Sequence, residues 1–165
     1  MGALSGVPRE LAVSFTGHRP PKLPWGYDES DPRCVDFKRR LIAEIRASYE
    51  NGYRYFLSGM ADGVDLYAAE AVIDLKSECP GMELVCVYPF GTGSDERRWA
   101  INAEAAKIVS LYDAYCTGCY SERNRVLVRS SSKLICGFSG DAASGTGATI
   151  RMALREDLRV SIISV

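Results

Sequence analysis

Short runs of apolar and β-branched residues alternate along this chain with longer stretches in which apolar residues recur every three or four positions. The short runs predict buried strands, and the period near 3.6 residues predicts amphipathic helices. We expect strands over residues 11–15, 53–57, 83–87, 114–116, 133–138 and 160–165. We expect helices over residues 35–49, 64–76, 94–111, 122–131 and 146–156.

Turn and cap residues mark the ends of several predicted helices. Asp31 and Pro32 open the first helix, and Ser94 is placed to cap the third. Asp62 is a competent N-cap for the second helix, with Asp65 three residues later in a capping-box-like arrangement. These residues account for the sharp turns without any ligand.

The alternation of strands and helices predicts the fold class. Strands separated by helices form parallel βαβ units with right-handed crossovers. No internal repeat or low-complexity linker divides the sequence, so we expect one domain over residues 1–165. The predicted fold is α/β, a single three-layer Rossmann-like domain with a mainly parallel sheet.

Composition and charge narrow the classes of partner. The 165 residues are 47% hydrophobic and 25% charged, with a formal net charge of −1. Nucleic-acid binding usually needs a basic face, so this balance does not favour such a partner. No segment approaches the roughly 20 apolar residues of a membrane span, and the first ten residues lack the order of a signal peptide. We therefore expect a cytoplasmic protein without membrane contact, and the sequence leaves its oligomeric state open, a homo-oligomer included.

Glycine-bearing polar loops follow three of the predicted strands. In such a sheet, ligands bind outside the carboxyl ends of the strands. Two of the loops open helices, whose free first-turn amides suit a phosphate, and glycine lets the anion approach the backbone closely. One such loop alone is more simply a turn, but three at corresponding strand ends favour a ligand that carries phosphate. The loops contain Thr16, Gly17, His18 and Arg19; Ser58, Gly59, Met60, Ala61, Asp62 and Gly63; and Ser144, Gly145, Thr146 and Gly147.

Two common phosphate-binding signatures are missing from these loops. Neither G-x-G-x-x-G nor G-x-x-x-x-G-K-[ST] occurs in the sequence. Ordinary NAD binding and P-loop hydrolysis are therefore not expected.

Five segments carry a family resemblance. They are SFTGHRP at 14–20, SGMADGVD at 58–65, YPF at 88–90, ERNR at 122–125 and SGTGAT at 144–149. In this order they resemble the YpsA-like family of the SLOG superfamily, whose relatives include DNA-processing protein A and the Lonely-guy phosphoribohydrolases. The resemblance runs from about residue 12 to the C-terminus. It implies a Rossmann-like domain that binds a nucleotide or nucleotide-derived ligand, with Pro89, Phe90, Arg123 and Asn124 joining the glycine loops in the site.

The resemblance also bears on catalysis. The phosphoribohydrolases look like M-x-x-R-K followed by P-G-G-x-G-T-x-x-E, and their arginine and glutamate serve hydrolysis of the N-glycosidic bond. Here Arg123 matches the arginine, Asn124 stands at the lysine position, and Thr149 stands where the glutamate would be. A threonine cannot replace a carboxylate as a general base near neutral pH. We therefore expect no catalytic residues of this type and lean towards a binding domain.

Other candidates have simpler explanations. His18, the only histidine, is more often structural than catalytic in such a position. Arg125 is a second candidate for clamping phosphate beside Arg123, and Trp25 either stacks on a base or pins its proline-rich loop. Cys116 and Cys119 form a C-x-x-C pair, but no second pair or nearby histidine completes a zinc site, so no metal is expected.

Three functions follow from the sequence. The leading hypothesis is a cytosolic domain that binds a nucleotide-type ligand for sensing or regulation, with no cofactor required. The first alternative is an N-glycosidic hydrolase of nucleotides or ADP-ribose-type compounds that uses Asp95, Glu96 or Glu122. The second is single-stranded nucleic-acid binding, which a surface cluster of Arg19, Lys22, Arg123, Arg125 and Arg129 would support.

Overall fold

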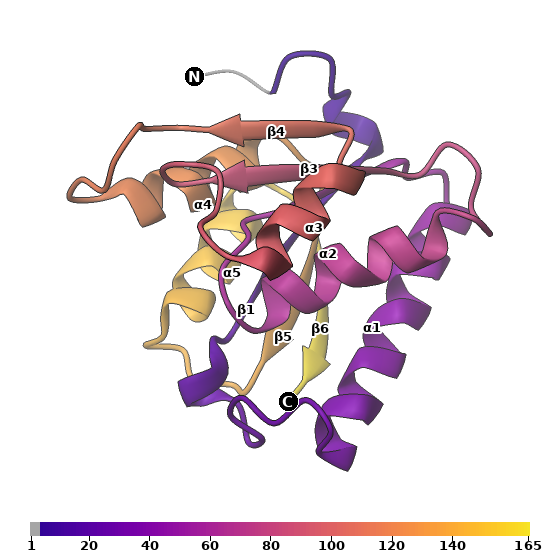
Figure 1. The fold of residues 1–165 in the computed structure, drawn as a ribbon, viewed down its shortest axis with the longest axis vertical. Helices are drawn as coiled ribbons and strands as arrows, with labels where there is room; N and C mark the ends of the chain where they lie inside the picture. The colour runs from indigo at the N-terminus through magenta and orange to yellow at the C-terminus, as the bar shows by residue number, and fades with distance from the viewer. Residues whose placement is uncertain (1–3) are drawn as a thin grey trace.

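The computed structural model describes residues 4–165 and shows one six-stranded sheet in which every neighbouring pair of strands is parallel (Figure 1). The strand order is β4-β3-β2-β1-β5-β6. The strands are β1 (Ala12–Gly17), β2 (Tyr55–Ser58), β3 (Glu83–Tyr88), β4 (Lys107–Ser110), β5 (Lys133–Phe138) and β6 (Arg159–Ser164). The predicted α/β Rossmann-like fold is confirmed.

Five α-helices connect the strands and cover both faces of the sheet (Figure 1). The helices are α1 (Pro32–Glu50), α2 (Val64–Leu75), α3 (Glu96–Glu104), α4 (Cys119–Arg129) and α5 (Gly145–Arg155). Because β1, β2, β3 and β4 follow one another in the sheet, right-handed crossovers place α1, α2 and α3 on one face. The chain then crosses β1 to reach β5, which places α4 and α5 on the opposite face.

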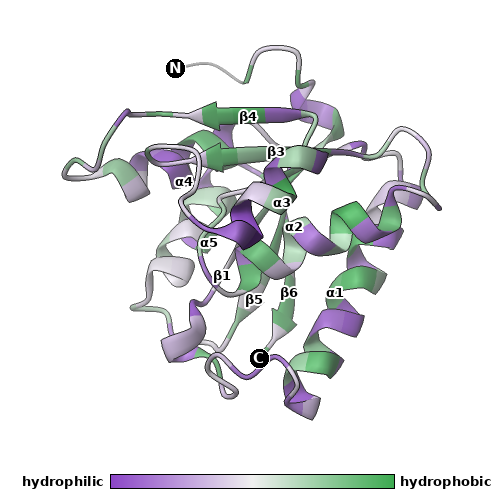
Figure 2. Ribbon diagram, viewed as in Figure 1, coloured by the Kyte–Doolittle hydropathy of each residue, from purple (hydrophilic) through white to green (hydrophobic). Residues whose placement is uncertain are grey.

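Buried apolar residues pack at both interfaces between sheet and helices. Figure 2 shows hydrophobic positions on the strands and on the helices that cover them. Phe15, Phe56 and Leu84 point towards α1 and α2, where they join Phe37 and Val72 in one buried cluster. On the other face Leu57 and Val85 pack against Val126 and Leu127 of α4, and Leu134 packs against Ile150 of α5. Continuous burial of the central strands on both faces is typical of parallel sheets.

Two glycines at strand ends bring α2 close to the sheet. A Cβ atom on Gly17 would lie 2.4 Å from the Val64 Cβ atom, and one on Gly137 would lie 2.7 Å from Val64 Cγ2. Gly17 and Gly137 are paired with each other across the neighbouring strands β1 and β5. Val64, the first residue of α2, therefore packs directly on backbone at the carboxyl edge of the sheet.

The region between α3 and α4 differs from the sequence prediction. The helix predicted over 94–111 ends at Glu104, and Lys107–Ser110 forms the edge strand β4. Residues 114–116, predicted as a strand, lie in a loop. Half-buried and exposed residues alternate along β4, as is typical of an edge strand. The alanines before it favour a helix, so the predicted helix was extended across this strand.

Two predicted caps are also wrong. Asp95, not Ser94, caps α3, and its carboxylate accepts from the Arg98 amide at 2.9 Å. Gly63, not Asp62, is the N-cap of α2, with φ at 90° and no side-chain cap bond. Asp62 instead forms an ion pair with Arg98 at 2.8 Å.

Candidate functional site

The carboxyl edge of the sheet gathers the glycine loops around β1. The sheet order reverses at this strand, which pairs with β2 on one side and β5 on the other. Gly17 ends β1, Gly59 follows β2, and Gly145 opens α5 after β5. The three loops therefore meet at the topological switch point, where α/β folds bind ligands.

A cavity of about 570 Å³ opens at this point, and we call it the switch-point cavity. Its volume lies within the range of about 300–1,000 Å³ that is typical of ligand pockets. Five of its residues were not among the predicted ligand-binding residues: Pro21, Lys22, Asp65, Tyr120 and Ser121. The predicted residues that line it are Thr16, Gly17, His18, Arg19, Ala61, Arg123, Asn124, Ser144, Gly145 and Thr146.

The first turn of α5 presents free donors at this cavity. Ser144 caps the helix, and its hydroxyl accepts from the Gly147 amide at 3.0 Å. The amides of Gly145 and Thr146 have no hydrogen-bond partner within residues 4–165. No atom lies within 4 Å of a Cβ built on Gly145. The helix N-terminus is therefore open to an anion, which its partial positive charge favours.

A buried guanidinium lies beside these amides. Arg123 of α4 is 4% exposed; its Nε donates to the Asn124 side chain and its Nη1 to the Gly59 carbonyl. Its Nη2 has no hydrogen-bond partner in the described part of the chain. Among the described residues, Ser130 Oγ is the one polar side-chain atom that is both fully buried and without a partner, so Nη2 is not fully buried. Nη2 therefore keeps contact with the solvent of the cavity.

The charge of Asp65 acts on Arg123, but the two side chains form no direct ion pair. Asp65 accepts from the Ala61 amide at 3.3 Å. Burial raises the pKa of Asp65, and the charge of Arg123 opposes this shift. Burial lowers the pKa of Arg123, so in both residues burial disfavours the charged form. The guanidinium is therefore incompletely neutralised, which favours a bound anion.

The contacts of His18 hold two loops together. It is 2% exposed, and its Nε2 accepts from the Ser139 amide at 3.1 Å and lies 2.8 Å from the Ser139 hydroxyl. Burial lowers its pKa, an effect that Lys22 reinforces and Asp141 opposes. The ring joins the end of β1 to the loop after β5 as a neutral imidazole.

A second, smaller cavity of about 260 Å³ adjoins the first, and we call it the aromatic cavity. The two cavities share Arg19, Ala61, Tyr120 and Arg123. Its other lining residues are the predicted Gly59, Met60, Asp62, Pro89 and Phe90, together with Tyr88, 91–95 and Arg98.

Phe90 and Tyr120 line this cavity, and their rings pack with that of Tyr115, which does not line it. The ring centroids of Phe90, Tyr115 and Tyr120 lie 5.9–6.2 Å apart. Tyr115 and Tyr120 are both exposed. The Arg19 guanidinium lies 5.0 Å from the centre of the Tyr120 ring, a cation–π contact at the border of the two cavities.

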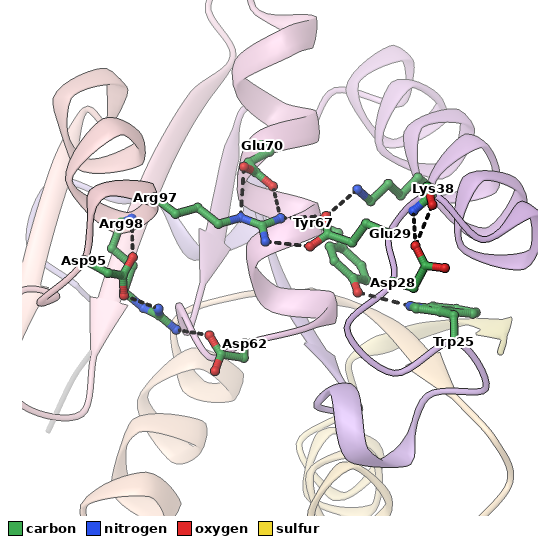
Figure 3. A network of polar contacts seen from close by, with 11 residues as sticks. Trp25, Asp28, Glu29, Lys38, Asp62, Tyr67, Glu70, Asp95, Arg97 and Arg98 are labelled. Atoms are coloured by element: carbon green, nitrogen blue, oxygen red, sulfur yellow. Dashed lines mark hydrogen bonds and ion pairs between the residues drawn. The ribbon is translucent and has the colours of Figure 1, made fainter.

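Ion pairs fix the loops that surround these cavities (Figure 3). Arg97 binds Glu29 and Glu70, which joins the loop before α1 to α2 and α3. Arg98 binds Asp62 and Asp95 and donates to the Met60 carbonyl at 3.0 Å. The β2–α2 loop, where Met60 has a φ of 60°, is thus held against α3.

Three of the predicted ligand-binding residues line neither cavity. The Ser58 hydroxyl donates to the Asp65 carbonyl and accepts from the Met60 amide. A Cβ on Gly63 would lie 2.5 Å from the His18 carbonyl oxygen, and one on Gly147 would lie 2.6 Å from the Ala142 carbonyl oxygen. These residues shape the loops.

The remaining candidates are also accounted for by contacts outside the cavities. Trp25 is buried on Phe37 and donates to the Tyr67 hydroxyl at 3.1 Å, so it pins its loop. Arg125 pairs with Glu122. Of the five basic residues considered for a nucleic-acid surface, Arg19, Lys22 and Arg123 gather at the switch-point cavity, and Lys22 lies 3.5 Å from Asp141.

The predicted position of a catalytic glutamate lies outside both cavities. Thr149 is 2% exposed, and its hydroxyl donates to the Gly145 carbonyl one turn earlier in α5. Of the carboxylates considered as substitutes, Asp95 is engaged by Arg98 and Glu122 by Arg125, while Glu96 lines neither cavity. Asp65 is a carboxylate of the switch-point cavity that was not predicted as a site residue. The sequence pattern indicates a helix-capping residue at this position.

The C-x-x-C pair lies at the start of α4. Cys119 is buried and Cys116 partly exposed, and both are free thiols. Within residues 4–165, no group of three or more histidine, cysteine, aspartate or glutamate side chains is arranged to hold a metal. The same range contains no helix with the length and apolarity of a membrane span.

Comparison with known proteins identifies relatives of this chain. Residues 13–136 match the model of the YpsA family, described as the YspA SLOG family. The UPF0398 protein YpsA of Bacillus subtilis is 28% identical over 88 residues, which cover 53% of this chain and 47% of that protein. A UPF0398 protein of Brevibacillus brevis is 25% identical over 120 residues, which cover 66% of this chain and 63% of that protein. The chain thus spans about half the length of the curated relatives it matches, from 36% to 63%.

A solved structure shares the fold. It concerns the single-stranded DNA binding mode of DNA processing protein A from Helicobacter pylori. The match has a TM-score of 0.64 and 22% sequence identity, and it covers 94% of this chain and 65% of that one.

Proposed function

This chain belongs to the YspA SLOG family, and from that premise we propose that its switch-point cavity binds the phosphate of a nucleotide or nucleotide-derived ligand. The observation that carries the proposal is the meeting of two free α5 amides, at Gly145 and Thr146, with the buried and incompletely neutralised Arg123. Helix amides and a guanidinium supply the directed donors that a phosphate accepts.

Arg19 adds a third source of positive charge. It is exposed at the cavity and forms no ion pair in the described part of the chain, so its guanidinium is available to a ligand. Lys22 is partly neutralised by Asp141. The cavity therefore carries local positive charge on a chain whose formal net charge is −1.

A regulatory or sensing role fits this chemistry better than hydrolysis. The site offers directed donors for phosphate, but Thr149 lies outside the cavity, and the carboxylate within it, Asp65, is buried beside Arg123. A ligand held without being consumed acts by the difference in its affinity for two states of the protein.

Calorimetric titration with adenosine, guanosine, cytidine and uridine monophosphates and ADP-ribose tests the proposal. Gly145→Val places a branched side chain over the free amides, where no atom lies within 4 Å of the Cβ position. We expect it to weaken binding by more than about tenfold, a change of about 1.4 kcal/mol. Ala148→Val, at an exposed position of the same helix, is the matched control.

A charge pair of variants completes the test. Arg19→Ala should weaken binding and reduce its salt dependence, whereas Arg155→Ala removes the same charge from the exposed far end of α5. Binding that is unchanged in both Gly145→Val and Arg19→Ala would refute the phosphate site. Mass spectrometry of small molecules that co-purify with the native protein would then identify the natural ligand.

Single-stranded DNA binding is the second candidate function. The exposed rings of Tyr115 and Tyr120 beside Arg19 combine stacking surfaces with positive charge, as single-strand binders do. The shared fold with a single-stranded DNA-binding protein supports the test. Titration with oligothymidylate distinguishes the candidates, because DNA binding requires affinity that grows with oligonucleotide length and that a mononucleotide does not match.

A further inference from the structure

We propose that the aromatic cavity is a base-binding subsite, so that the ligand is a nucleotide whose phosphate and base occupy the two adjoining cavities. The inference rests on the proposed phosphate site and adds to it the part of the ligand that gives selectivity.

The volume of the aromatic cavity fits a base. The aromatic cavity, at about 260 Å³, is smaller than the roughly 300–1,000 Å³ of a complete ligand pocket. It suits one flat group and not a whole nucleotide. Since Arg19, Ala61, Tyr120 and Arg123 line both cavities, a ligand held at the α5 amides extends directly into it.

Charge separates the two cavities by chemistry. In the aromatic cavity the charge of Arg98 is matched by Asp62 at 2.8 Å and Asp95 at 2.6 Å. Arg98 is the one cation that lines the aromatic cavity alone, so the wall away from the border carries no unpaired positive charge. Arg19 and Arg123, which form no carboxylate ion pair in the described residues, lie at the border with the switch-point cavity, where the α5 amides add further donors. The anionic part of a ligand is therefore favoured in one cavity and an uncharged part in the other.

The walls of the aromatic cavity are suited to a π surface. Phe90 and Tyr120 pack at a centroid distance of 6.1 Å with their planes 72° apart, an edge-to-face contact. Their contact with Tyr115 holds both rings in place. Rigid rings lose little conformational entropy on binding, and base–aromatic stacking is sequence-tolerant.

The test compares ligands that contain both parts or one. Adenosine monophosphate, ribose 5-phosphate and adenosine are titrated calorimetrically into the full chain. We expect the monophosphate to bind about tenfold more tightly than ribose 5-phosphate, the ratio that a stacking contribution of about 1.4 kcal/mol gives. Phe90→Leu, at a ring that lines only the aromatic cavity, should lower that ratio severalfold and leave the affinity for ribose 5-phosphate within about twofold. Tyr120→Leu should also lower the ratio. Tyr112→Leu, at an exposed tyrosine outside both cavities, is the matched control.

Three other results would overturn the base subsite. Equal affinity of the wild-type protein for the monophosphate and for ribose 5-phosphate would overturn the base subsite and leave the phosphate site standing. Equal weakening of both ligands by Tyr120→Leu would show that the ring only holds Arg19, which also overturns the inference. Binding of neither phosphorylated compound would overturn the phosphate proposal and the subsite with it.

Discussion

Adding one methyl group at Gly59 or at Gly145 should have opposite effects on stability. Both glycines follow strands at the same edge of the sheet, and neither has a positive φ. A Cβ on Gly59 would lie 2.9 Å from Arg123 Nη1 and 2.9 Å from Asp65 Oδ2, whereas a Cβ on Gly145 meets no atom within 4 Å. The local environment, not the residue type, decides the outcome.

The magnitudes follow from these distances. Overpacking a buried site costs about 1–3 kcal/mol, and here the displaced groups are charged and buried. At Gly145 the substitution reduces the freedom of the unfolded chain, which contributes about 0.4–1 kcal/mol of stability. For a domain of this size each kcal/mol shifts Tm by about 2–4 °C. Gly59→Ala should therefore lower Tm by about 2–12 °C, and Gly145→Ala should raise it by about 1–4 °C.

Thermal and chemical denaturation of the two variants measure the difference directly. Titration of each folded variant with adenosine monophosphate then separates stability from binding, because Gly145→Ala should weaken the ligand while stabilising the fold. A Gly59→Ala protein at least as stable as wild type would refute the packing argument. A destabilised Gly145→Ala protein would show that the first turn of α5 is less open than the geometry indicates.

Three further predictions follow from burial and charge. Burial lowers the pKa of His18 below its usual 6.5, so the unfolded chain takes up a proton first as the pH falls. The free energy of unfolding should therefore decrease as the pH falls below 6.5, and His18→Gln should flatten that dependence in denaturant titrations. Five of the six cysteines are buried, so a thiol reagent should label the native protein first at Cys116, and Cys116→Ser should abolish the fast phase. The wild-type protein should release no free base from nucleoside monophosphates at rates near 10 per second, the approximate median for enzymes; turnover at that level in a base-release assay would promote the hydrolase hypothesis.

The fold was predictable because hydrophobic periodicity reports it directly. The strand predicted over 133–138 matches β5 at both ends, since a buried parallel strand reads as a continuous apolar run. The edge strand β4 was missed because it pairs on one side only and keeps alternate residues exposed, which leaves a short and faint signal. The preceding Ala105 and Ala106 favour a helix and extended the predicted α3 across it.

The site was predictable in its loops but not in its side-chain directions. Parallel topology brings the carboxyl ends of strands together, so glycine loops after β1, β2 and β5 had to meet. Whether the Ser58 hydroxyl faces the cavity or the Asp65 carbonyl depends on a rotamer that the local sequence does not specify. Tyr115 and Tyr120 were missed because their partner Phe90 is at least 25 residues away in sequence, and only the tertiary structure brings the rings together.

The proposal that this site binds a ligand without hydrolysing it rests in part on the position of Thr149. Cleavage of an N-glycosidic bond needs a carboxylate near the sugar carbon that develops positive charge. Thr149 instead turns its hydroxyl back to the Gly145 carbonyl and lies outside the cavity, so a glutamate there would first have to leave the packed face of α5. Asp65 does line the switch-point cavity, but it accepts from the Ala61 amide, and moving it would remove the carboxylate that acts on the charge of Arg123. Phosphate binding needs none of these rearrangements, because the α5 amides and Arg123 already face the cavity. The proposal therefore predicts recognition without chemistry, because the donors for an anion face the cavity whereas Asp65, Asp95 and Glu122 are engaged in other contacts.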